Sequence, residues 1–177
     1  GANLISFYVL PEDNSVEGMM EPLDGNIMAI LSGGAATQYL DGWGWIGSLT
    51  SLEHEAGYWL IMNGADELDL EGCLSPMSSS LVYNLNAGSN LISFPVPWCV
   101  PVEDAIPNEI QIYVQDQSND SFGMNFFIGE GQASVLMDDE WVGSLINLCG
   151  EKGYWANVSS EVSFIFETDV DQLSRQL

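Results

Sequence analysis

Positive charge is almost absent from this sequence. Its 177 residues contain only two basic side chains, Lys152 and Arg175, against 26 Asp and Glu, so the formal net charge is -24. Proteins bind nucleic acid through lysines and arginines that displace the counterions around the phosphates, so nucleic acid is excluded as an ordinary partner. Anionic membrane surfaces are disfavoured for the same reason.

Long apolar runs are also missing. None approaches the roughly 18 to 20 residues that a transmembrane helix needs, so we expect no membrane insertion. The chain nevertheless has material for a core, because 46% of its residues are apolar and 11% are aromatic. This composition argues for a folded protein despite the charge.

The excess of carboxylates has two interpretations. One is a solvated, self-repelling surface adapted to salt water, where charges are strongly screened. The other is calcium binding, because hard oxygen ligands suit that ion, although no EF-hand spacing is present. We expect no bound cofactor, with calcium as the alternative. The candidate metal ligands are Asp138, Asp139 and Glu140, and a second acidic cluster comprises Asp66, Glu67, Asp69 and Glu71.

Cysteine and histidine are scarce. The three cysteines, Cys73, Cys99 and Cys149, include no Cys-x-x-Cys pair and so indicate no metal or redox site. One disulfide with a thiol left over, and three free thiols, are both compatible with the sequence. The single histidine, His54, has no serine or cysteine in a nucleophile motif to activate. We therefore assign no catalytic residue and expect a non-enzyme, with a glycosidase as the less favoured alternative.

Several motifs occur twice. The pentad Asn-Leu-Ile-Ser-Phe at 3–7 returns at 90–94, an offset of 87 residues, and two later anchors return at an offset of 96. The sequence therefore predicts two copies of one module, at 1–74 and 81–168, with a linker at 75–80 and a tail at 169–177. The later anchors are Trp45-Ile46-Gly47-Ser48-Leu49 with Trp141-Val142-Gly143-Ser144-Leu145, and Gly57-Tyr58-Trp59 with Gly153-Tyr154-Trp155.

Each copy is predicted to be mainly β, with α+β as the alternative, to contain one short helix, and to be related to the other by a pseudo-twofold axis. In the first copy, Asn14 is the expected helix cap, and an apolar face follows at Val16, Met19, Met20 and Leu23. In the second copy the helix is expected to start at Pro101 and to stop at Pro107.

Short runs rich in branched and aromatic residues, with glycines at the joints, predict the strands. A longer hairpin tip is expected around 115–125. The strand at 81–85 has no counterpart before Gly1, so we expect either that a longer chain supplies it or that another segment covers the edge. The expected strands are 4–10, 27–31, 37–40, 43–47, 58–62 and 67–70, then 81–85, 110–114, 122–128, 133–137, 141–143, 154–158 and 162–166.

The motif order, with Ser15-Val16-Glu17, Gly42-Trp43 and Leu49–Leu52 between the pentad and Gly-Tyr-Trp, resembles a repeat of secreted proteins from marine and related bacteria. That repeat often begins Gly-Trp-Asn-Leu-Ile-Ser, and here its tryptophan is replaced by Ala2 and Ser89. The resemblance implies an extracellular or cell-surface module of no established chemistry. A start at Gly1 without a methionine is interpreted as processing after export.

Tryptophans are the candidates for ligand binding, because an aromatic face covers the C–H surface of a sugar while carboxylates accept its hydroxyls. Trp59 and Trp155 are expected in the core. Trp43 and Trp98 lie beside turns and break the repeat, so we expect them to be exposed and to bind ligand. The predicted function is a non-enzymatic binding module for carbohydrate or protein, with a structural spacer or assembly module of a larger surface protein as the alternative.

Overall fold

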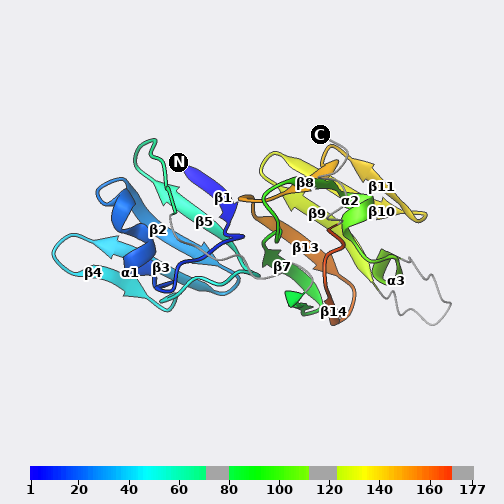
Figure 1. Ribbon diagram of the computed structural model, residues 1–177, viewed down its shortest axis with the longest axis horizontal. Helices are drawn as coiled ribbons and strands as arrows, with labels where there is room; N and C mark the ends of the chain where they lie inside the picture. The colour runs from blue at the N-terminus through cyan, green and yellow to red at the C-terminus, as the bar shows by residue number, and fades with distance from the viewer. Residues whose placement is uncertain (71–79, 112–122, 169–177) are drawn as a thin grey trace.

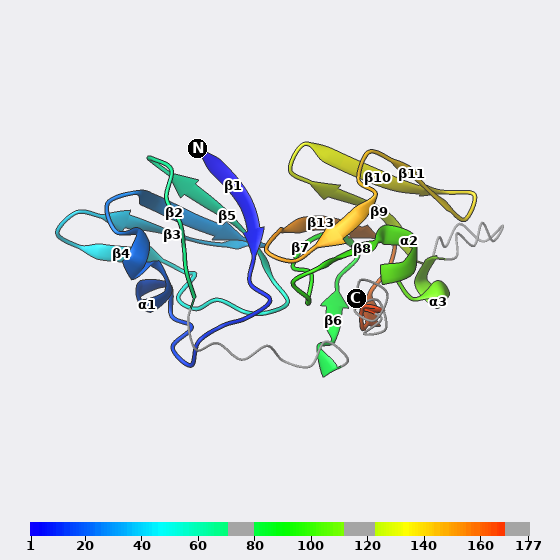
Figure 2. The same ribbon diagram turned by 45° about the horizontal axis from the view of Figure 1, so that its top comes forward.

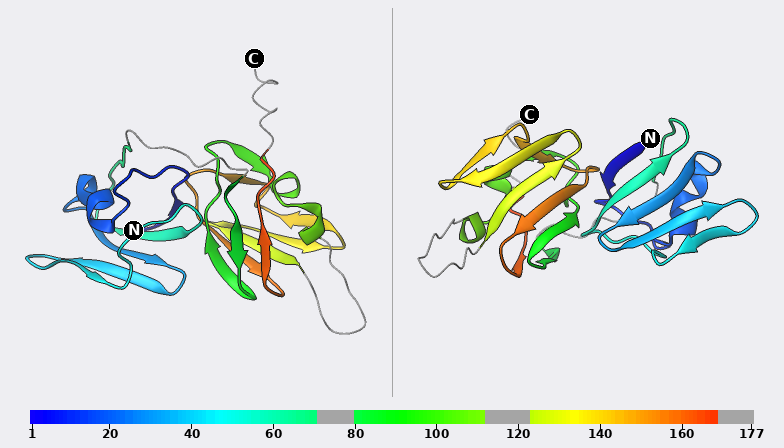
Figure 3. Two further views of the ribbon diagram at one scale, coloured as in Figure 1. Left: turned by 60° about the horizontal axis from the view of Figure 1, so that its bottom comes forward. Right: turned by 180° about the vertical axis from the view of Figure 1, so that it is seen from behind.

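The computed structural model describes residues 1–70, 80–111 and 123–168, and strands dominate it (Figure 1). Residues 1–70 are called the first copy below, and residues 80–168 the second copy. Each copy forms its own five-stranded sheet, and the two sheets lie next to each other (Figure 3). The prediction of a mainly β fold is confirmed. No helix in the described ranges is long and apolar enough to cross a membrane.

The sheet of the first copy is antiparallel, with strand order β1-β5-β2-β3-β4. One of its faces carries the core, where the short helix α1 packs its apolar residues against Ile30 and Leu60. The elements are β1 (Ala2–Ser6), α1 (Val16–Met20), the 3-10 turn η1 (Glu21–Leu23), β2 (Ile27–Ser32), β3 (Ala35–Leu40), β4 (Gly44–Gly47) and β5 (Gly57–Met62).

The apolar face predicted for α1 is confirmed, because Val16, Met19, Met20 and Leu23 are all buried. The cap is one residue later than predicted. Ser15 Oγ accepts a hydrogen bond from the Gly18 amide at 3.1 Å. Asn14 instead turns its side-chain amide toward the carbonyl of Leu52, at 2.8 Å.

The second copy repeats this plan and adds to it. Its main sheet has strand order β11-β10-β9-β13-β7, and two small sheets pair β12 with β8 and β14 with β6. The elements are β6 (Tyr83–Leu85), β7 (Gly88–Ile92), β8 (Cys99–Pro101), α2 (Val102–Ala105), α3 (Asn108–Gln111), β9 (Met124–Gly129), β10 (Gln132–Met137), β11 (Glu140–Gly143), β12 (Asn147–Cys149), β13 (Tyr154–Val158) and β14 (Val162–Phe164).

Two predicted strands are wrong. The one predicted at 110–114 starts inside α3, since Pro107 presets a helical φ and its carbonyl accepts from the Ile110 amide at 3.0 Å. The remainder of that range, and most of the hairpin tip predicted at 115–125, lies outside the described residues. The one predicted at 67–70 is not a strand, because no described segment pairs with it.

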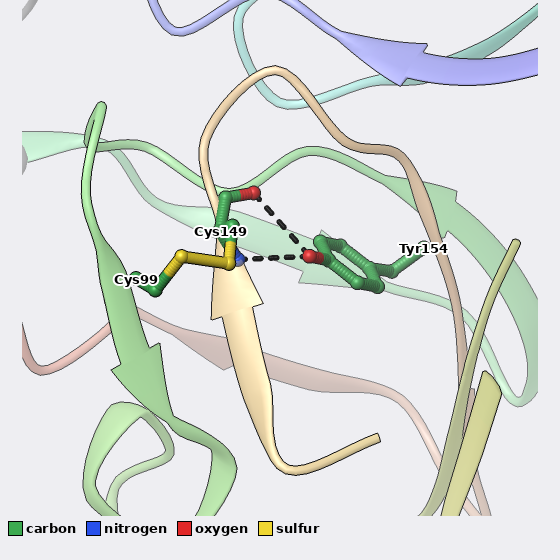
Figure 4. The surroundings of a disulfide bond; sticks show 3 residues. All are labelled: Cys99, Cys149 and Tyr154. Atoms are coloured by element: carbon green, nitrogen blue, oxygen red, sulfur yellow. Dashed lines mark hydrogen bonds between the residues drawn. A yellow bond between two sulfur atoms is a disulfide. The ribbon is translucent and has the colours of Figure 1, made fainter. Parts of the chain in front are cut away.

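A disulfide joins β8 to β12 through Cys99 and Cys149, and Cys73 lies outside the described residues (Figure 4). The amide of Cys149 donates to the Tyr154 hydroxyl at 2.8 Å, and that hydroxyl donates back to the Cys149 carbonyl at 3.3 Å. In the first copy, Tyr58 makes the same pair of bonds with the backbone of Glu53, at 2.7 and 3.4 Å. The tyrosine of Gly-Tyr-Trp therefore anchors a loop in both copies.

The two copies contact each other through equivalent residues. The Ser6 amide donates to the Glu151 carbonyl at 3.1 Å, and the Ser93 amide donates to the Glu55 carbonyl at 3.0 Å. Ser6 and Ser93 occupy the same place in the pentad, and Glu55 and Glu151 both lie two residues before Gly-Tyr-Trp. In each copy, the loop before Gly-Tyr-Trp therefore accepts a hydrogen bond from the pentad strand of the other copy. Such a reciprocal contact is expected of two units related by a twofold axis.

The pentad serines are buried at this contact, at 3% exposure for Ser6 and 0% for Ser93. Ser6 Oγ donates to the Lys152 carbonyl at 2.7 Å. Ser93 Oγ bonds the His54 carbonyl and the Tyr83 hydroxyl. A buried hydroxyl costs free energy unless it is hydrogen-bonded, so these partners explain a serine inside an apolar strand.

Candidate ligand-binding site

Trp43 lies at the tip of the β3–β4 hairpin, with 81% of its surface exposed. Leu40 pairs with Gly44 across the hairpin, and Gly42 and Gly44 adopt positive φ angles of 75° and 76°. In the second copy the matching tip contains only Asp138 and Asp139, so Trp43 has no counterpart there. The prediction that Trp43 is exposed is confirmed, and its ligand role stays a prediction.

Trp98 does not share this exposure. It is half-buried and packs against the core of the second copy, so the prediction that it is exposed is wrong. The next residue, Cys99, is tied to β12 by the disulfide, which holds the segment against the core. The indole Nε1 of Trp98 is buried with no hydrogen-bond partner among the described residues. The ligand role of Trp98 stays a prediction.

The three predicted metal ligands form a tight turn. Asp138 and Asp139 have φ angles of 50° and 65°, and Glu140 begins β11 opposite Met137. Two successive left-handed residues form the turn that suits a two-residue hairpin, and aspartate tolerates that conformation. Within the described residues, no three or more His, Cys, Asp or Glu side chains gather as a metal site would need. Calcium binding stays a prediction.

A pocket of about 420 Å³ opens between α1 and the β3–β4 hairpin. Its aromatic wall is Tyr39 on β3 and Trp45 on β4, which face each other directly across the two strands. Their ring centroids are 5.6 Å apart, with an interplanar angle of 67°. Four carboxylates from α1 and the loops at its ends line the other side: Asp13, Glu17, Glu21 and Asp24.

One carboxylate of the acidic wall, Asp13, is held in place by the cap residue Ser15. The side chain and backbone amide of Ser15 both hydrogen-bond Asp13, the amide at 3.0 Å, and these bonds lower the pKa of Asp13. Asp13 therefore stays ionised under mildly acidic conditions. A Cβ on Gly18 would lie 2.7 Å from Asp13 Oδ2, so glycine at this position keeps room for the carboxylate.

In the second copy, the tryptophan at the equivalent position has different neighbours. Trp141, the counterpart of Trp45, donates from Nε1 to Gln111 Oε1 of α3 at 2.8 Å. It also packs on Phe127 with ring centroids 5.6 Å apart, and its cross-strand neighbour is Leu136 instead of a tyrosine. The pair of Tyr39 and Trp45 in the first copy therefore has no counterpart in the second, where the tryptophan is hydrogen-bonded to α3.

Sequence reasoning missed this pocket. Trp45 belongs to a motif shared by both copies, and that repetition favoured a purely structural role. The available signal was the pair Tyr39 and Trp45 on either side of the Asp-Gly-Trp turn, since residues at that spacing face each other across a hairpin. No family model, curated protein or solved structure matches the chain.

Proposed function

We propose that this chain is a non-enzymatic binding module, extracellular or on the cell surface, that binds carbohydrate in the pocket between α1 and the β3–β4 hairpin. The observation that carries the proposal is the aromatic pair Tyr39 and Trp45 opposite a wall of carboxylates, in a pocket of about 420 Å³. Such pockets bind small polar molecules when a few polar groups converge beside an apolar wall.

The two walls of the pocket would contact different parts of a sugar. A sugar ring has an apolar C–H face, which an aromatic side chain covers, and Tyr39 remains 37% exposed for this contact. The sugar hydroxyls donate to carboxylate oxygens, and hydrogen bonds to ionised acceptors are the stronger ones. Trp43, at the tip of the same hairpin, is not among the residues that line the pocket. A ligand with several hydroxyls on one face fits this arrangement best.

The disulfide and the charge support the proposed location. Disulfides form and persist in oxidising environments, which include the outside of the cell, and Cys99–Cys149 cross-links β8 to β12. A net charge of -24 keeps such a chain dispersed in salt-rich surroundings.

A glycosidase would need one carboxyl group kept protonated near neutral pH to serve as general acid. The pKa of Asp13 is shifted the other way, because its bonds from Ser15 favour the ionised form. Asp13 is therefore unsuited to the role of general acid.

An assembly module of a larger surface protein is the second candidate, favoured by the exposed outer face of the second sheet. Apolar side chains gather there on neighbouring strands and would be covered in an assembly. These exposed residues are Ile128, Val135, Met137 and Val142, with Ile146 beyond the end of β11.

The test is a glycan screen read by tryptophan fluorescence, followed by calorimetry on any hit, with and without millimolar calcium at matched ionic strength. Replacing Tyr39 by Ala should weaken binding at least about tenfold, since it removes an aromatic contact in the pocket. Replacing Trp43 by Ala tests separately whether the hairpin tip binds ligand. The matched control is Ile146→Ala, an exposed apolar residue of the second copy, 70% exposed.

The carboxylate wall is tested by the double variant Glu17→Gln and Glu21→Gln, which keeps the shape of the pocket and removes two charges. It should weaken binding without changing thermal stability, because both side chains are exposed. A glycan that binds Tyr39→Ala and Ile146→Ala equally well would show that the pocket is not the site. Release of free sugar would show that the protein is an enzyme.

A further inference from the structure

In the second copy, strand β6 (Figure 2) buries the side chains of Tyr83 and Leu85 in the core. β6 pairs antiparallel with β14, so that Tyr83 lies opposite Phe164. Tyr83 is 1% exposed, stacks on Phe164 with centroids 5.7 Å apart and meets the edge of Phe166 at 4.8 Å. Its hydroxyl bonds Ser93 Oγ at 2.7 Å.

In the described part of the chain, the first copy contains the same surroundings without a paired strand. At the offset of 96 residues, Leu68 and Leu70 correspond to Phe164 and Phe166, and Ser6 corresponds to Ser93 by the pentad. Both leucines are half-buried against the core of the first copy. Within the described ranges, the backbone groups of 68–70 hydrogen-bond to no other residue. An extended segment without a partner strand offers its N–H and C=O groups for pairing.

A cavity of about 270 Å³ lies where the missing tyrosine would be. It is lined by Ser6, Phe7, Leu68 and Leu70, the counterparts of the residues around Tyr83, together with Ile5, Tyr8, Val9, Asp69 and Glu151. The cavity is several times the ~30 Å³ that one molecule of liquid water takes up. Its walls are mainly apolar, and one buried serine hydroxyl stands where Ser93 meets the phenol in the second copy.

We propose that the first copy takes up an extended strand from another polypeptide, with the alternation Leu-x-Tyr-x-Leu that 81–85 has in the second copy. The strand pairs antiparallel with 66–70 and places its tyrosine ring in the cavity. Strand addition of this kind draws affinity from backbone hydrogen bonds and specificity from the alternate side chains that enter pockets.

Charge defines the outward side of the incoming strand. In the second copy, Ser163 of β14 donates to Asn84 of β6 at 2.7 Å, and Glu67 corresponds to Ser163. Asp69 and Glu151 also border the cavity. A lysine or arginine at the position of Asn84 would therefore face Glu67, beside the other acidic residues that border the cavity. The partner that fits best is apolar inward and cationic outward.

The strand site shares no lining residue with the pocket between α1 and the β3–β4 hairpin. It is tested with the full chain and a synthetic peptide that has the sequence of residues 80–86, with binding measured by calorimetry. Hydrogen exchange of the complex should slow at 67–70. A peptide with Ala in place of Tyr83 should bind at least about tenfold more weakly, because an aromatic side chain buries the largest area in such a contact.

A second peptide, with Lys in place of Asn84, tests the charge. It should bind about twofold to fivefold more tightly at low ionic strength, the range of a single exposed ion pair. The gain should disappear in high salt and also against the protein variant Glu67→Gln. This variant keeps the length of the side chain and so serves as the matched control.

Failure to bind the peptide at millimolar concentration would overturn the proposal. So would protection at 162–164 in place of 67–70, because the peptide would then be replacing β6 in the second copy. The protein variant Leu68→Asp should abolish binding. If that variant unfolds, the location of the exchange protection in the unmodified protein decides the question.

Discussion

The contact between the two copies predicts that adding one methyl group, at Gly153, will strongly lower the stability of the protein. Gly153 lies where the loop of the second copy crosses β1, and a Cβ there would be 2.7 Å from the Ile5 carbonyl oxygen and 2.8 Å from Leu4 Cδ1. Gly57 is its counterpart, with the Ile92 carbonyl oxygen also at 2.7 Å. Because ordinary contact begins near 3.4 Å, the substitution Gly153→Ala must push the loop and the strand apart.

Three hydrogen bonds cross the contact at this point. The Ser6 amide donates to Glu151 at 3.1 Å, Ser6 Oγ donates to Lys152 at 2.7 Å, and the Gly153 amide donates to Leu4 at 3.3 Å. A typical hydrogen bond contributes about 0.5–1.5 kcal/mol net, so weakening all three should cost about 2–4 kcal/mol. For a chain of this size that lowers Tm by roughly 5–15 °C.

The assay is urea unfolding and thermal unfolding of Gly153→Ala beside Gly33→Ala. Gly33 lies in the turn between β2 and β3, where a Cβ would meet nothing within 4 Å. The control should therefore lie within about 0.5 kcal/mol of the unmodified protein. Equal stability of the two variants would refute the close approach and the interface built on it.

Reducing the Cys99–Cys149 disulfide, which closes a loop of 50 residues, should lower the free energy of unfolding by about 4 kcal/mol; urea midpoints with and without reductant measure this. Burial raises the pKa of Tyr58 to about 12 from 10.0. The contribution of the buried phenol to stability is therefore complete below pH 10 and is lost as pH rises to about 12. Alkaline denaturation followed by tyrosinate absorbance will check this loss. Ser93→Ala leaves the buried Tyr83 hydroxyl without its serine partner and should cost about 1–3 kcal/mol in the same urea assay, and an unchanged midpoint would contradict that bond.

Local sequence patterns correctly predicted the features that depend only on residues close in the sequence. The spacing of Val16, Met19, Met20 and Leu23 can bury only one side of a helix, and the structure buries all four. The position of Trp43 beside a turn, where it breaks the repeat, likewise predicted its exposure, and 81% of its surface is exposed. The cap was misplaced by one residue because Asn14 and Ser15 are both good caps, and the contact of Asn14 with Leu52 decides between them.

Features that depend on a distant partner escaped prediction. Residues 67–70 have the alternation of a strand, but a strand forms only where another one pairs with it. The pocket depends on the register that brings Tyr39 opposite Trp45 and on a helix that leaves the pair uncovered. The burial of Trp98 depends on a disulfide whose pairing the sequence left open.

The reciprocal loops have a consequence for how the molecule responds to dilution. A contact in which each half offers the same two surfaces is the interface of a symmetric dimer, and in separate halves its occupancy would fall as the protein is diluted. Joining the halves in one chain holds the surfaces at an effective concentration on the order of millimolar. The hydrogen bonds from Ser6 to Glu151 and from Ser93 to Glu55 thus form an interface like that of a dimer, but its occupancy does not depend on protein concentration.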